Sequence, residues 1–175
     1  MAKRLSRSNK QLALEELYFY KIDAELGLKK LFAEPQSKES LLFLTPTEIK
    51  ELLAQRIKEL ELQASLTLFT SLEAMFQIDF HDRIEKRAKD ELSQIFKERN
   101  HQGSARISFE GDILNMWEEI YPQTRKYFQP IKAALKYRHW LAHGRYWLLK
   151  SPTMDFEELY GLAETLQNTL EEQSC

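Results

Sequence analysis

The stretch from Thr45 to Phe80 reads TPTEIKELLAQRIKELELQASLTLFTSLEAMFQIDF. It opens with a helix N-terminus in which Thr45 is the N-cap, Pro46 takes the first helical position and Glu48 completes a capping box. Leucine, isoleucine, phenylalanine and methionine then recur at helical spacing, and neither Gly nor another Pro interrupts them. The pattern predicts two long helices, or one bent helix, over residues 46–99.

Helical patterns also flank this stretch on both sides. They cover about residues 9–32, 109–120, 124–143 and 155–171. Ser108 and Asp155 are the expected N-caps of the second and fourth segments, and Gly144 is a natural stop for the third. Pro130 lies inside the third segment and predicts either a kink or a later start.

Composition supports an all-helical fold. Five Gly and five Pro in 175 residues are about half of average usage, and 43% of the residues are hydrophobic. We therefore expect an all-α, single-domain bundle of five or six helices, several of them long. Residues 1–40 are expected to form an N-terminal helix packed on or preceding the bundle, and residues 41–172 the helical domain.

Cysteine usage and hydropathy indicate a protein inside the cell and off the membrane. Cys175 is the single cysteine, so it can form neither an internal disulfide nor a cysteine metal site. The basic N-terminus is followed by no signal-type apolar run, and no span approaches 18 uncharged apolar residues. We expect a cytoplasmic protein without a membrane segment.

The charge is distributed unevenly along the chain. Its net value is −2, but residues 120–154 hold seven cations and no acid, against 18 cations and 27 acids elsewhere. The basic segment (residues 120–154) is a candidate anion site. The ordinary alternative is a solvated helix face that pairs with acids such as Glu157, Glu158 and Glu164.

The chemistry within the basic segment favours phosphodiester transfer. Residues 135–147 read LKYRHWLAHGRYW, with two histidines, two arginines and two tyrosines. Metal-free cleavage of RNA needs a proton-transfer group that titrates near neutral pH and a permanent cation for the phosphate, while the 2′-hydroxyl serves as the nucleophile. Histidine and arginine supply those two functions.

The string RHWLAH, from Arg138 to His143, resembles the Arg-x4-6-His signature of the HEPN superfamily. The blocks SLEAMFQIDF (residues 71–80), GDILNMWEEIYP (111–122) and KYRHWLAHGRYW (136–147) follow the order of a bacterial HEPN subgroup, so the resemblance covers about residues 40–170. HEPN proteins are compact α-helical bundles, often homodimers. Many are metal-independent endoribonucleases that act as toxins, in phage defence or in RNA processing.

The resemblance implies Arg138 and His143 as catalytic residues, with His139 as a polar active-site neighbour. Arg145 and Tyr146 lie beside them, although the family's modified tyrosine stands two residues after the histidine, where this chain has Arg145. The implied activity cuts RNA by 2′-hydroxyl attack without a cofactor, and the implied partners are RNA, a second copy and an antitoxin protein. The alternative is a non-catalytic HEPN module that binds nucleotide, RNA or an antitoxin.

The spacing of Arg138 and His143 raises a geometric question. Five residues along a straight helix turn two side chains about 140° apart. Either the helix unwinds near His143, or the long arginine reaches round, or a second copy completes the site.

Two acids and one histidine pair complete the candidates. Glu73 and Asp79 lie in an otherwise apolar stretch, so we expect an ion pair to Arg138 or Arg145 that orients the site. His139 and His143, four residues apart, share a helix face and could ligate a metal, but no HExxH glutamate or nearby cysteine accompanies them. We expect no metal.

Overall fold

The computed structural model describes residues 12–86, 88–101, 107–150 and 153–173. Its six α-helices are α1 (Leu14–Ala33), α2 (Pro46–Glu85), α3 (Glu91–His101), α4 (Asn115–Ile120), α5 (Arg125–Ala142) and α6 (Phe156–Glu172). The described ranges contain no strand, so the expected all-helical bundle is confirmed. Of the N-terminal segment predicted over residues 9–32, the first three residues lie outside the described part.

The predicted caps are present. Thr45 Oγ1 accepts from the Glu48 backbone N–H, and the Glu48 carboxylate accepts from the Thr45 N–H at 2.7 Å. Asp155 caps α6 in the same manner, accepting from the Glu158 N–H at 2.8 Å. These side chains satisfy N–H groups that the first turn of a helix leaves without partners, which is why both helices begin where the sequence indicated.

The segment over residues 46–99 forms two helices. α2 continues for 40 residues, and α3 starts afresh at Glu91. The Asp90 carboxylate accepts from the Ser93 N–H at 3.0 Å and so caps α3. Asp90 is the start signal that separates the two helices.

The second and third flanking segments, predicted over residues 109–120 and 124–143, also form, with local differences. Ser108 caps the second of the flanking segments, but its first part is a π-helical turn, η3 (Phe109–Leu114), that leads into α4. α5 starts at Arg125 and runs through Pro130, so the later start is excluded. α5 ends at Ala142, and Gly144, two residues later, takes a φ of 80° that does not continue the helix, as predicted.

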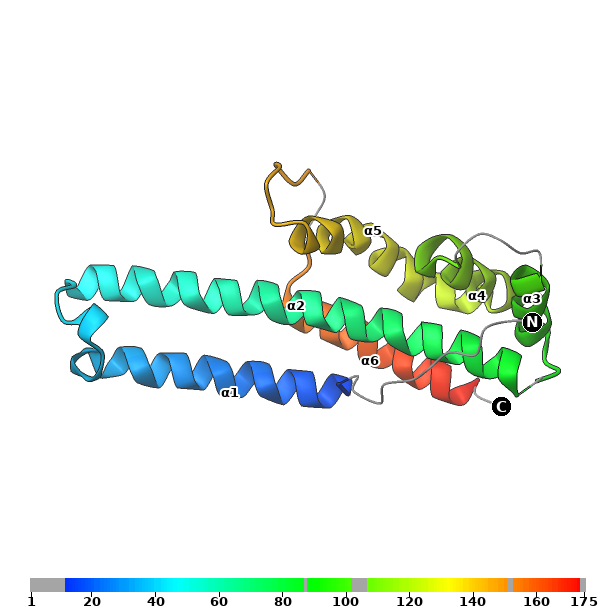
Figure 1. Ribbon diagram of the computed structural model, residues 1–175, viewed down its shortest axis with the longest axis horizontal. Helices are drawn as coiled ribbons and strands as arrows, with labels where there is room; N and C mark the ends of the chain where they lie inside the picture. The colour runs from blue at the N-terminus through cyan, green and yellow to red at the C-terminus, as the bar shows by residue number, and fades with distance from the viewer. Residues whose placement is uncertain (1–11, 87, 102–106, 151–152, 174–175) are drawn as a thin grey trace.

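The helices form a body and a projecting arm (Figure 1). α3, α4, α5, α6 and the second half of α2 make the body, whose core holds the Phe76 ring against Phe109, Trp117 and Phe128 at centroid distances of 5.5 to 5.8 Å. The arm is α1 lying antiparallel to the first half of α2. No α2 residue before Ser65 is buried. α5 and α1 lie on opposite sides of α2.

Candidate functional site

Arg138 projects from α5 onto α2. Its Nη2 donates to Glu73 Oε2 at 2.8 Å, and each side chain is about one third exposed, 31% and 32%. The Nε of Arg138 is buried without a hydrogen-bond partner in the described structure. The ion pair expected for Glu73 is therefore present, and it fixes one edge of the guanidinium.

The chain reverses directly after α5. His143 is the C-cap, with φ of −102° and ψ of 23°, and Gly144 and Arg145 both take positive φ. Trp140 Nε1 then donates to the Trp147 carbonyl at 2.8 Å, which folds residues 144–147 back against the helix. Of the three options for the Arg138 to His143 spacing, the helix does end at His143.

A pocket of about 980 Å³ opens between this returning loop, α5, η3 and α2. Its polar lining combines three cations, a histidine and two acids: Lys136, Arg138, Lys150, His139, Glu73 and Glu110. Phe109, Trp147 and three leucines supply apolar surface. The pocket can thus take a ligand that carries both negative charge and a flat apolar group.

The two histidine rings contact one another beside this pocket, with their planes inclined by 48°. Their ring centroids are 4.2 Å apart, and the His139 ring also lies 5.7 Å from the Trp147 ring. His139 belongs to the pocket lining, whereas His143 does not. The structure therefore brings Arg138 together with His139 in the pocket, and places His143 next to His139 but outside the lining.

Arg145 and Tyr146 lie outside the pocket lining. The Arg145 guanidinium binds Glu59 of α2 through two hydrogen bonds, at 2.7 and 3.0 Å. Arg145 holds the pKa of the Glu59 carboxyl below its ordinary value, and Glu59 in turn raises the pKa of Arg145. Tyr146 is 83% exposed, with its ring against Trp147. Arg145 therefore connects the loop after α5 to the arm through its hydrogen bonds to Glu59.

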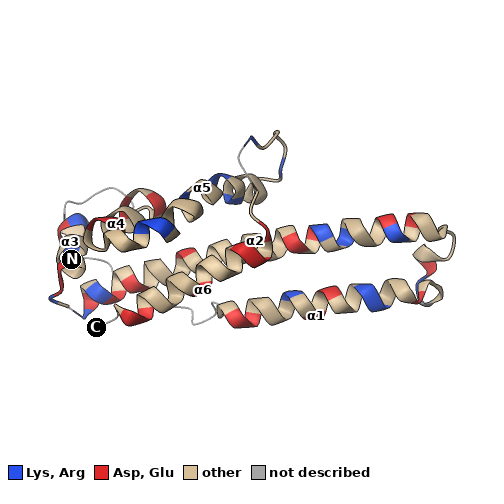
Figure 2. Ribbon diagram, turned by 180° about the vertical axis from the view of Figure 1, so that it is seen from behind, with Lys and Arg blue, Asp and Glu red and all other residues tan. Residues whose placement is uncertain are grey.

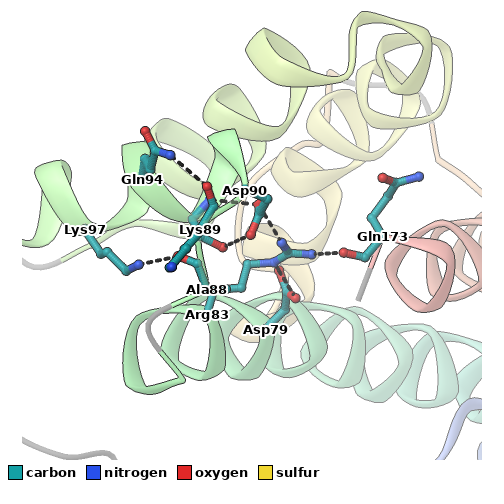
Figure 3. A network of polar contacts seen from close by, with 9 residues as sticks. Asp79, Arg83, Ala88, Lys89, Asp90, Gln94, Lys97 and Gln173 are labelled. Carbon is teal, nitrogen blue, oxygen red and sulfur yellow. Dashed lines mark hydrogen bonds and ion pairs between the residues drawn. The ribbon is translucent and has the colours of Figure 1, made fainter. Parts of the chain in front are cut away.

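The expectation of an ion pair between Asp79 and Arg138 or Arg145 is wrong. Asp79 instead accepts two hydrogen bonds from Arg83, one turn further along α2, at 2.8 and 2.9 Å. Arg83 is 3% exposed and also binds Asp90 and the Gln173 carbonyl (Figure 3). Burial raises the pKa of Asp79, which Arg83 opposes. An acid and a base four residues apart pair within the helix, so Asp79 has no need of a partner on α5.

The basic segment is partly neutralised, by acids other than those expected. Its cations pair with Glu59, Glu73 and Glu118, the last of which lies 3.0 Å from Lys132 and 4.0 Å from Arg125. Glu157, named as a partner in the alternative of a solvated helix face, binds Lys21 of α1 instead. Lys136 and Lys150 form no ion pair with any described residue, and both line the pocket. Figure 2 shows the cations on α5 and its loop, beside an α6 that carries acids alone.

Several pocket residues have no individual signal in the sequence. Lys136 and Lys150 belong to the basic segment, where nothing local separates them from its other cations. Phe109 and Glu110 come from the π-helical turn, and the periodicity of the sequence does not reveal the geometry of that turn. Trp147 reaches the pocket because two consecutive positive φ angles turn the chain, and the sequence marks only Gly144 for that role.

Neither a metal cluster nor a membrane span is present in the described ranges. No three His, Cys, Asp or Glu side chains gather there in a way that would hold a metal ion. Among the helices described, none has the length and apolarity required to span a bilayer. No family model, curated protein or solved structure matches the chain significantly.

Proposed function

We propose that the chain is a metal-independent endoribonuclease of HEPN type. The observation that carries the proposal is the pocket in which three cations and His139 outnumber two acids, on a protein whose charge outside the basic segment is acidic. Cations concentrated in one cleft attract a phosphate, while the acidic surface elsewhere repels the rest of the RNA. The cut strand is single-stranded, because its bases must leave a helix to stack on an aromatic side chain such as Trp147.

Arg138 is the proposed phosphate ligand. Glu73 engages its Nη2, which leaves Nη1 without a protein partner in the described structure and free to donate to a phosphate oxygen. Guanidinium remains charged throughout the reaction and donates hydrogen bonds in a fixed plane. It can therefore stabilise the added charge of the pentacoordinate transition state.

The histidine pair is the proposed proton-transfer group. The 2′-oxygen attacks phosphorus as its proton passes to an imidazole, and the P–O5′ bond breaks as an imidazolium of the histidine pair gives a proton to the 5′-oxygen. The products are a 2′,3′-cyclic phosphate and a 5′-hydroxyl. His143 is the residue implied by the signature, and His139 is the one that lines the pocket, so the 4.2 Å distance between their ring centroids supports a shared role.

A second candidate is a non-catalytic module that binds nucleotide, RNA or an antitoxin protein. It is favoured by one observation, namely that His143 lies outside the pocket lining.

The HEPN resemblance further suggests a cytoplasmic toxin or phage-defence protein that forms homodimers and is inhibited by an antitoxin. Growth arrest on expression, lost in Arg138→Ala, would support the toxin role.

The test is incubation of the purified protein with single-stranded RNA in excess EDTA. We expect cleavage to 2′,3′-cyclic phosphate ends, lost in Arg138→Ala and in the His139→Ala/His143→Ala double variant. Lys126→Ala is the matched control, because Lys126 belongs to the same basic segment but lies over the Tyr127 ring outside the pocket lining. Uncut RNA that still binds the wild type, with binding lost in Arg138→Ala, would establish the non-catalytic candidate instead.

A further inference from the structure

One face of α1 remains apolar and uncovered in the described structure. Leu14 and Leu17 are buried, and the Tyr18 ring lies against Phe156 and Tyr160, so the inner face of α1 is occupied by the body. On the opposite side Phe19 is 55% exposed and Leu26 is 58% exposed. Seven residues separate them, and Ile22 lies between, which is the spacing of a helix-pairing seam.

Charged side chains of opposite sign lie at the two ends of this apolar seam. The α1 outer face, defined as Glu15, Phe19, Ile22, Asp23, Leu26 and Lys30, is acidic at its first turn and basic at its last. At about 100° per residue, all six side chains project within about 60° of Phe19. Glu15 and Lys30 are both exposed, and neither forms an ion pair with a described residue.

The apolar and charged residues of the α1 outer face are spaced symmetrically about a point between Ile22 and Asp23. Phe19 and Leu26 are equally far from it, and so are Glu15 and Lys30. Two copies laid antiparallel across a twofold axis at that point would put Phe19 of each chain level with Leu26 of the other. Glu15 of each would then lie level with Lys30 of the other. A twofold pair repeats each contact, so both the apolar and the charged pairs occur twice.

We propose that the α1 outer face binds the same face of a second copy of this chain, antiparallel. Charge complementarity selects this occupant, because a parallel pair would set Glu15 against Glu15 and Lys30 against Lys30. One feature opposes tight binding, since the two Asp23 carboxylates meet beside the axis. The pairing rests on the homodimer within the proposed function and specifies its interface, but it lies on the far side of α2 from α5, so it leaves the pocket of each chain uncovered.

Charge reversal tests the proposal through mass measurement, which does not depend on RNA cleavage. The wild type is expected to sediment at twice the 20.8 kDa of one chain as its concentration rises. Glu15→Lys alone and Lys30→Glu alone should each be monomeric, because each places like charges level with one another. Mixing those two variants should restore a dimer, since every Lys then meets a Glu. Asp23→Asn should lower the dissociation constant.

Apolar variants provide the second arm. Phe19→Asp should abolish the dimer, whereas Phe43→Asp should leave it unchanged, because Phe43 is 89% exposed but lies outside the α1 outer face. Circular dichroism of both variants is the check that they remain folded. A wild type that stays monomeric at every concentration would overturn the proposal, as would a dimer indifferent to Glu15→Lys. A monomer that dimerises only after deletion of residues 1–11 would also overturn it, by identifying that segment as the occupant.

Discussion

Glu73 and Arg138 stand 65 residues apart in the sequence, yet their Oε2 and Nη2 atoms lie 2.8 Å apart and join the second half of α2 to the last part of α5. Because the Arg138 Nε is buried without a partner in the described structure, this single contact orients the guanidinium. Glu73 is thus a positioning residue for the proposed phosphate ligand.

Glu73→Gln should separate the effect of Glu73 on the orientation of Arg138 from its effect on the stability of the fold. A partly exposed ion pair contributes at most about 1 kcal/mol, so urea unfolding should show only a small loss. RNA cleavage should fall about tenfold, equivalent to about 1.4 kcal/mol of transition-state stabilisation, because glutamine keeps a hydrogen-bond acceptor but lacks the charge that holds Arg138 in place. Glu118→Gln, which removes the acid beside Lys132, nearly two turns before Arg138 on α5, is the control and should leave cleavage unchanged. Equal losses of cleavage in both variants would contradict the positioning role.

Arg83→Met should destabilise the fold more than a substitution at an exposed ion pair does. The arginine is 3% exposed and binds Asp79, Asp90 and the Gln173 carbonyl, so its removal leaves two carboxylates without their cation. We expect a loss of about 3 to 5 kcal/mol in the free energy of unfolding, measured in urea. Lys86→Met removes a pair whose lysine is 64% exposed and should cost less than about 1 kcal/mol. Similar losses in the two variants would show that the Arg83 cluster stabilises little.

Two glycines should respond to alanine in opposite directions. Gly144 has φ of 80°, so Gly144→Ala is strained by about 1 kcal/mol even though no atom lies within 4 Å of the new Cβ. Gly161 lies inside α6, where a Cβ also meets nothing within 4 Å, and Gly161→Ala should stabilise by about 0.5 to 1 kcal/mol. Thermal unfolding of the two variants measures the difference. A stabilising Gly144→Ala would argue against the positive φ.

The contact between Glu59 and Arg145 should be sensitive to acid. Arg145 lowers the pKa of Glu59 in the folded protein below its ordinary value of 4.5. The stabilisation is therefore complete above pH 4.5 and is lost as the pH falls through the lowered pKa. A carboxyl carbon NMR titration should show Glu59 titrating below 4.5 in the wild type and closer to 4.5 in Arg145→Ala. Identical midpoints in the two proteins would contradict the ion pair.

The sequence predicts best where short-range chemistry determines the structure. Thr45 and Asp155 accept from N–H groups three residues away, so their helix starts can be recognised without any tertiary information. The division between α2 and α3 is harder to locate, because periodicity continues across it and only the Asp90 cap marks the new start.

The candidate site was predictable only in part, because its partners come from distant helices. The motif led to Arg138 and His139, but nothing local ties Glu59 to Arg145 across 86 residues. The expected partner of Asp79 was wrong because Arg83, four residues away, pairs with it within α2. The π-helical turn that brings Phe109 and Glu110 to the pocket likewise has no periodic signature.

The length of α2 has one more consequence, which concerns register. The same uninterrupted helix holds Glu59 against Arg145 and Glu73 against Arg138, so its winding sets the angle between the two carboxylates. A single residue inserted between them would rotate one carboxylate by about 100° relative to the other and move it along the axis by about 1.5 Å. The number of α2 residues between Glu59 and Glu73 is therefore fixed by the two contacts. The part of the helix that precedes Glu59 can lengthen or shorten without disturbing either arginine.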